Sequence, residues 1–247
     1  MGTWPWMLET NGRLTRRQRF ELFPALLDTF GAFFVDRLRL ALAKSPRHGL
    51  NAEDLWPTAP DSKLSRQADE KARDLQSAAM LHHGHRTWIF GSALARIDGA
   101  PIDPELFHAG ALLHDVGLED IQGGRCFTRR SAEAAQAIAR SCQLAADRTS
   151  DMMTGIIMHI TPGLEYEDSP LGFYLQAGAM ADLVGIRAWE LPRALRDRAH
   201  ATHTRAEIHQ VLSSCWHAEA KAVPGGRAHF ADAYGAFSRI VRWFPLR

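Results

Sequence analysis

Hydrophobic positions recur at helical spacing from the start of the chain. In residues 15–43, steps of three and four place the apolar side chains on one helical face. Thr15 and Gln18 have the spacing of a capping box, which predicts that the helix begins there. Pro24 predicts a break near Phe23, because proline resists helix interiors. The apolar face comprises Phe20, Phe23, Leu27, Phe30, Phe34, Leu38 and Leu42.

The helical period continues through the rest of the chain. Residues 1–13 read as an irregular arm, and residues 44–61, with three prolines and a glycine, as a loop with at most one short turn. No alternating strand pattern and no tandem repeat occurs, so the predicted class is all-α. The predicted helices begin at Ser62, which caps a stretch to about Leu81, and continue through 88–97, 103–114, 131–146, 150–159, 171–185, a segment after Pro192, 205–219 and 228–243.

The length of 247 residues allows a single domain with a substantial core. We expect one domain over 1–247. It would comprise an N-terminal arm and helix (1–61), a central helical bundle (62–190) and additional C-terminal helices (191–247).

Charge and cysteine content narrow the classes of partner. The net charge is +1, from 29 basic and 28 acidic residues, so no global field attracts nucleic acid or an anionic membrane. Three widely spaced cysteines without a CxxC motif favour reduced thiols and a cytoplasmic location. The N-terminus lacks the pattern of a signal peptide, and the most apolar windows are too interrupted to span a membrane.

The twelve histidines are the functional hint in the composition. His114 and Asp115 are adjacent at the end of an apolar run, and Asp182 lies in the apolar segment QAGAMADLVG. Unpaired carboxylates are costly in such surroundings. With His85, these residues supply two imidazoles and two carboxylates from three predicted helices, a set that can close on a divalent ion in a bundle. Mixed nitrogen and oxygen ligands suit zinc first, with iron, manganese or nickel as alternatives, rather than calcium.

These segments resemble the HD-domain metal-dependent hydrolase superfamily, and within it the cyanamide-hydratase-like branch. The resemblance covers roughly residues 70–190 and rests on the order and spacing of its segments. They are HGHRTWIFGSALA (83–95), DPELFHAGALLHDVGLED (103–120), RCFTRRSAEAA (125–135), GIIMHITPG (155–163) and GAMADLVGIR (178–187).

The resemblance implies an HD-domain-like helical bundle in which His85, His114, Asp115 and Asp182 bind the metal. Members that hold two metals use two further histidines between the adjacent His-Asp pair (the HD pair, here His114 and Asp115) and the last aspartate, here Asp182. This chain has one histidine there, His159, which favours a single metal. Ser131 departs from the branch, which usually has glycine at that position, and this puts the local loop geometry in doubt.

Four further residues are candidates for the chemistry. His159 could transfer a proton or bind substrate, with a packing role as the alternative. Glu119 could act as a general base, although a carboxylate in a loop is most often solvated. Arg86 could bind an anionic group or pair with an acid, and Arg130 is a weaker candidate for substrate binding.

The expected function is that of a hydrolase or hydratase in which one metal activates water for attack on a small nitrile-, amide- or cyanamide-like carbon. One alternative is a phosphohydrolase acting on a nucleotide or another phosphate ester, which needs several cations around the substrate. The other is a non-catalytic, metal-stabilised binding module.

The expected partner is a small molecule. A homodimer interface and an intramolecular core are both open for the C-terminal aromatic residues Phe230, Tyr234, Phe237, Trp243 and Phe244.

Overall fold

The computed structural model describes residues 1–42 and 49–243, and it confirms the all-α class. Residues 43–48, which include the start of the predicted loop, and Phe244 lie outside the described residues. Within the described ranges there is no strand, only an isolated bridge between Arg13 and Gly226. The helices are α1 (Trp4–Thr10), α2 (Arg16–Ala41), α3 (Ala52–Leu55), α4 (Lys63–Leu75), α5 (Ala78–Ile97), α6 (Pro104–Leu113), α7 (Phe127–Ser141), α8 (Ala146–Met158), α9 (Pro170–Leu183), the 3₁₀ turn η1 (Ala188–Glu190), α10 (Arg193–Thr202), α11 (Ile208–Ala222), α12 (Arg227–Gly235) and α13 (Phe237–Trp243).

Several element boundaries differ from the sequence expectation. The N-terminal arm contains a helix, α1, capped by the hydroxyl of Thr3. The predicted break at Pro24 is wrong, because α2 runs through it. Both Pro24 and Phe20 are exposed, so water can reach the carbonyl that the missing proline N–H leaves without its helical partner. The predicted helix from Ser62 to about residue 81 is two helices, and Ser77 caps the second.

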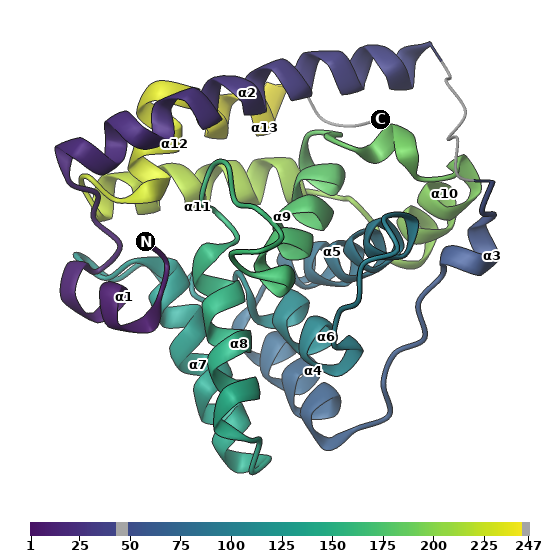
Figure 1. Ribbon diagram of the computed structural model, residues 1–247, viewed down its shortest axis with the longest axis horizontal. Helices are drawn as coiled ribbons and strands as arrows, with labels where there is room; N and C mark the ends of the chain where they lie inside the picture. Colours follow the sequence, from purple (N-terminus) through teal and green to yellow (C-terminus); the bar gives the residue numbers. More distant parts are fainter. Residues whose placement is uncertain (43–48, 244–247) are drawn as a thin grey trace.

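Helix α5 is the central element of the bundle (Figure 1). Its residues are buried on nearly every side, as expected of a helix that is enclosed by others. Helices α4, α6, α9, α10 and α11 all pack against it. A polar side chain that α5 buries therefore needs a partner inside the protein.

The most extensive helix contact in the bundle is between α5 and α9, and glycines allow the two helices to approach closely. A Cβ atom on Gly178 would lie 2.8 Å from the backbone nitrogen of Gly91 and closer still to the carbonyl oxygen of Thr87. A Cβ atom on Gly91 would lie 2.6 Å from the carbonyl oxygen of Tyr174. Both distances are below normal contact, so the two helices approach at this distance only because neither position has a side chain.

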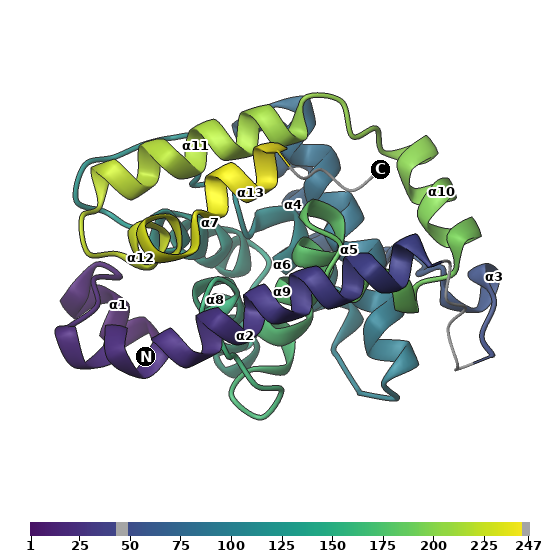
Figure 2. The same ribbon diagram turned by 90° about the horizontal axis from the view of Figure 1, so that it is seen from above.

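Helix α2 crosses the outside of the bundle, as both views show (Figure 1 and Figure 2). It contacts η1 and α12. Its inward side buries Leu22, Leu26 and Phe33, and Asp36 accepts a hydrogen bond from the backbone N–H of Arg187 at 2.9 Å. Among the described helices, none combines the length and apolarity needed to cross a membrane.

We predict that Gly178→Ala lowers the free energy of unfolding by about 1–3 kcal/mol, because the added methyl group forces α9 away from α5. Urea denaturation followed by circular dichroism measures this. Gly123→Ala is the matched control: a Cβ atom there meets nothing within 4 Å. Equal stabilities of the two variants would contradict the packing argument.

Candidate metal centre

His114 and Asp115 lie where α6 ends. The helix ends at Leu113, and His114 is its C-terminal cap. Nδ1 of His114 lies 2.7 Å from the carbonyl oxygen of Ala111. A carbonyl only accepts, so Nδ1 carries the proton and Nε2 presents a lone pair. That Nε2 lies 3.2 Å from Oδ2 of Asp115.

The turn after this pair is held by side chains of α7. The backbone N–H of Gly117 donates to the hydroxyl of Ser131 at 3.0 Å. The guanidinium of Arg130 donates to the carbonyl of Gly117 at 2.9 and 3.1 Å and pairs with buried Glu219 at 2.8 Å. The serine that departs from the resembled family pattern thus fixes the turn that carries the HD pair.

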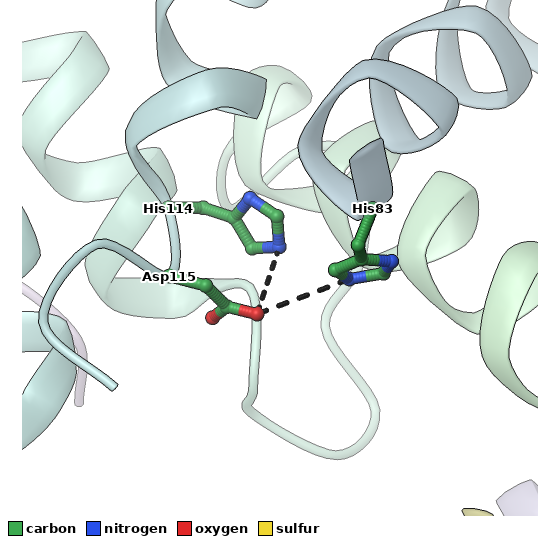
Figure 3. A group of neighbouring side chains, drawn as sticks. All are labelled: His83, His114 and Asp115. Carbon is green, nitrogen blue, oxygen red and sulfur yellow. Dashed lines mark ion pairs between the residues drawn. The ribbon is translucent and has the colours of Figure 1, made fainter. Parts of the chain in front are cut away.

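His83 of α5 completes the group (Figure 3). Its Nδ1 lies 2.7 Å from Oδ2 of Asp182, and its Nε2 lies 3.8 Å from Oδ2 of Asp115. One ligand atom from each of His83, His114 and Asp115 falls within 4.8 Å of the others, and all three residues are buried.

His159 approaches the same carboxylate from the end of α8. Its Nδ1 donates to the carbonyl of Ile156 at 2.6 Å, and its Nε2 lies 3.5 Å from Oδ1 of Asp115. Gln176 fixes the backbone after α8, since its Nε2 donates to the carbonyl oxygens of His159 and Thr161 at 2.7 and 2.8 Å. The prediction that His159 faces the metal pocket agrees with this position.

The three residues fit a divalent metal. Within the described part of the chain, Nε2 of His83, Nε2 of His114 and Oδ1 of Asp115 are buried and lack a hydrogen-bond partner. Buried polar atoms without partners are costly, and the two imidazole nitrogens both face Oδ2 of Asp115, which suggests a missing ligand between them. Each histidine also donates its other ring N–H to an acceptor, which is the arrangement that orients metal-binding imidazoles.

The electrostatics of the group favour a negative Asp115. Burial opposes its ionisation, but His114 and His159 overcome this and hold the pKa of Asp115 well below its usual range. Burial also opposes protonation of His114, yet the Asp115 carboxylate raises the pKa of His114 above its ordinary value. Burial lowers the pKa of His83 and of His159, so both rings are neutral at pH 7.

Asp182 supports the centre from behind. Its buried carboxylate accepts from Nε and Nη2 of Arg86 at 2.8 and 2.9 Å, in addition to the bond from His83. Burial raises the pKa of Asp182, but Arg86 and His83 outweigh it, and the net pKa lies well below the usual range. The Asp182 carboxylate is thus occupied by His83 and Arg86. It orients His83 and does not itself belong to the group formed by His83, His114 and Asp115.

The structure does not bring His85 to the centre, which corrects the expected ligand set. Two residues along α5 correspond to a turn of about 200° around the helix axis, so His83 and His85 face different sides. Nε2 of His85 lies 3.3 Å from Oδ1 of Asp69, and its ring stacks on His203 at 4.4 Å. Burial, followed by the proximity of His203, lowers the pKa of His85 to about 3.

The other three candidates have structural partners. Arg86 donates hydrogen bonds to the Asp182 carboxylate and to the carbonyl oxygens of His203 and Thr204. Arg130 is enclosed beneath the Gly117 turn, so neither arginine lines the cavity described below. Glu119 accepts from the backbone N–H of Ser77, the cap of α5, at 2.8 Å. The expected substrate and general-base roles of these residues are therefore replaced by positioning and capping.

A cavity of about 380 Å³ opens beside the centre. His83, His114, Asp115 and His159 form one wall. The remaining lining is mostly apolar and comes from α2, α9, α11, α12, α13 and the turns after α8 and α9. The cavity residues that sequence reasoning missed include Ala25, Asp28, Thr29, Phe173, Gln176, Met180, Leu212 and Trp216.

Comparison with models of known protein families and with curated proteins gave no match.

We predict that His83→Ala lowers the affinity for Zn²⁺ by more than about 100-fold, because a direct ligand is lost. His85→Ala, two residues away on the same helix, should leave the affinity unchanged. Isothermal titration of the metal-free proteins measures both. Loss of binding in His85→Ala with retention in His83→Ala would reverse the assignment.

We also predict that acid destabilises the metal-free protein through the histidines around His85. Burial lowers the pKa of His203 to about 4, against about 6.5 in the unfolded chain. The unfolded state therefore binds more protons between these values, and stability falls as the pH drops through this window. His203→Gln should reduce the slope of unfolding free energy against pH in this window, by an amount that corresponds to the uptake of up to about one proton on unfolding. Urea denaturation in a chelating buffer at several pH values measures the slopes, and parallel plots would contradict the assignment.

Proposed function

We propose that the protein is a metal-dependent hydrolase or hydratase that adds water to a small, uncharged carbon centre such as a nitrile or amide. The observation that carries this proposal is the wall of imidazoles around the buried Asp115 carboxylate, at the side of a cavity whose remaining lining is mostly apolar. The resemblance to the cyanamide-hydratase-like branch of HD-domain hydrolases points the same way.

The residues that would hold the metal are His83, His114 and Asp115, with Asp182 fixing the orientation of His83. Zinc suits this nitrogen and oxygen set, and iron, manganese or nickel are alternatives. A divalent metal bound there would acidify a water molecule and polarise an electrophile. Three protein ligands would leave a coordination position for water, as catalytic zinc sites do.

His159 is placed to move the proton. Its Nδ1 proton is held by the carbonyl of Ile156, so its unprotonated Nε2, which faces Asp115, can accept a proton from water. In a nitrile hydration, the water oxygen bonds to carbon and one C–N π bond breaks. His159 takes a proton from the water and returns it to the nitrogen. No net charge is left on the product, which suits an apolar cavity.

Gln176 supplies a polar contact for substrate. Both protons of its amide group are donated to backbone carbonyls, so its oxygen remains to accept a hydrogen bond in the cavity. An N–H group of an amide or amine substrate, or of the product, fits this acceptor.

The charge of the cavity argues against a phosphate ester. Arg187 is the one lysine or arginine in its described lining. This guanidinium pairs with Asp98 at 2.8 Å and with Glu190 at 2.7 Å. Asp28 adds a further acidic group to the lining. A phosphate would meet little free positive charge, whereas phosphoryl transfer depends on it.

We predict that the metal-loaded protein turns over small nitriles or amides and that Asp115→Asn abolishes this turnover. His159→Gln should retain the metal and lower kcat by roughly 10²–10⁴-fold, because the proton-transfer group is lost. Product formation across a panel of nitriles, amides and phosphate esters measures the activity. Glu119→Gln is the control and should leave turnover unchanged, since Glu119 caps α5 outside the cavity.

Two results would contradict the proposal. Turnover confined to phosphate esters would favour the phosphohydrolase alternative. Metal binding that raises the melting temperature without turnover of any substrate in the panel would favour a metal-stabilised binding module.

A further inference from the structure

The cavity beside the centre is larger than the reacting group proposed for it. A water molecule takes up about 30 Å³ in the liquid. A cavity of about 380 Å³ therefore has room for roughly a dozen groups of that size. A nitrile or a primary amide fills only a small part of this space. A substrate that matches the cavity carries a substantial further group, and the lining indicates the chemistry of that group.

Most of the lining away from the centre is apolar, and part of it is aromatic. Phe173 of α9, Trp216 of α11 and Phe237 of α13 contribute rings to it. The rings of Trp216 and Phe237 pack against each other, with their centroids 4.4 Å apart. Met180 and Leu212 add aliphatic surface. This wall favours an apolar or aromatic body for the substrate, because burial against it removes apolar surface from water.

Asp28 gives the cavity a charged group where it meets solvent. The residue belongs to α2, which crosses the outside of the bundle (Figure 2), and it lines the cavity while remaining exposed. In contrast, His83, His114 and Asp115 are at most 4% exposed. An exposed lining residue marks the mouth of a cavity, and buried ones mark its inner end. The Asp28 carboxylate thus lies at the mouth, and the metal centre lies at the inner end.

No neighbouring charge on α2 neutralises Asp28. Within the described residues, its carboxylate forms neither a hydrogen bond nor an ion pair. The other charged residues of α2 are at least seven positions away, which is about 10 Å or more along the helix axis. Among them, Arg17 pairs with Glu21, and Arg39 pairs with Asp36.

The one lysine or arginine of the described cavity lining is already neutralised by other groups. Arg187 pairs with Asp98 at 2.8 Å and with Glu190 at 2.7 Å. All three nitrogens of its guanidinium donate to these two carboxylates. The mouth of the cavity therefore keeps the negative charge of Asp28, which a cation from outside can complement.

We propose that the substrate carries a cationic amine, which Asp28 binds at the mouth of the cavity while the nitrile or amide reaches the metal centre. The proposal rests on the hydrolase or hydratase function and names the substrate class for it. That class is a nitrile or amide joined through an apolar, preferably aromatic, body to an ammonium group. A carboxylate only accepts hydrogen bonds, so the N–H donors of an ammonium group complement it.

Charge would also fix the orientation of such a substrate. A divalent metal held with the single carboxylate of Asp115 would leave the inner end positive, so that end would repel an ammonium group. An ammonium group is also costly to bury against the apolar middle of the cavity. At Asp28 it meets an opposite charge and keeps part of its contact with water. The uncharged nitrile or amide is then the end of the substrate that faces the centre.

Isothermal titration with a matched pair of amides tests the proposal without turnover. The para-(aminomethyl) and para-(hydroxymethyl) derivatives of benzamide have similar shapes, and only the first is cationic at neutral pH. We expect the wild type, with and without added Zn²⁺, to bind the amine about 3- to 5-fold more tightly, because partly solvated ion pairs contribute little. Asp28→Asn should abolish this preference, and Asp28→Lys should reverse it.

The control is Glu21→Lys, which reverses an exposed charge of the same helix outside the cavity. It should retain the preference for the amine. In the wild type, the preference should also shrink as the salt concentration rises, because salt screens an exposed ion pair. Equal affinities of the wild type for the two amides, or binding of neither, would overturn the proposal.

Turnover separates this proposal from the function on which it rests. With the corresponding benzonitriles, the wild type should show a lower KM for the amine, and in Asp28→Asn the loss should fall on KM more than on kcat. Turnover of both nitriles with equal KM values would overturn the amine site and leave the hydratase function standing. An Asp28-dependent preference in binding, without turnover of either nitrile, would support the amine site and contradict the hydratase function.

Discussion

The buried ion pair between Arg86 and Asp182 is the interaction on which the rest of the structure depends. Both side chains are fully buried, one on α5 and one on α9. A buried charge without its partner costs several kcal/mol, so these helices must meet in one register. Arg86 also binds the carbonyls of His203 and Thr204, which ties the link between α10 and α11 to the same point. Asp182 in turn fixes the proton of His83 on Nδ1. The packing of the bundle and the readiness of the centre for a metal therefore have one physical origin.

Features local in the sequence, such as helix caps and helical spacing, predicted most of the central helices. The caps at Ser62 and Asp103 and the helical spacing identified the central helices, and the adjacent His114 and Asp115 identified one half of the centre. The structure places His83, and not the expected His85, beside this pair. Because α5 is buried on nearly all sides, it has no apolar face from which its orientation can be read. One cue was available: Arg86 lies three residues after His83 and shares its face, so pairing Arg86 with Asp182 points to His83.

The roles of Arg130 and Glu119 show a different limit of sequence reasoning. Charged residues beside the adjacent His114 and Asp115 resemble substrate ligands in the sequence, but the turn after Asp115 leaves buried carbonyls without helical partners. Those carbonyls require donors, and Arg130 supplies them. The N-terminus of α5 likewise requires acceptors, and Glu119 supplies one. Such needs depend on which backbone groups are buried in three dimensions, which the order of residues alone does not specify.

Helix α2 shows the same limit for a whole helix face, because the sequence does not specify which of its faces is buried. Its regular stripe of phenylalanines and leucines predicted an amphipathic helix, and such a stripe is ordinarily the one that a domain buries. The structure instead buries a second, shorter set, Leu22, Leu26 and Phe33, and leaves the regular stripe exposed except for the partly buried Phe30. The surface of a bundle is uneven and accepts irregular spacing, as this inner set has. The spacing of apolar residues therefore predicted the helix correctly but not the face that it turns toward the bundle.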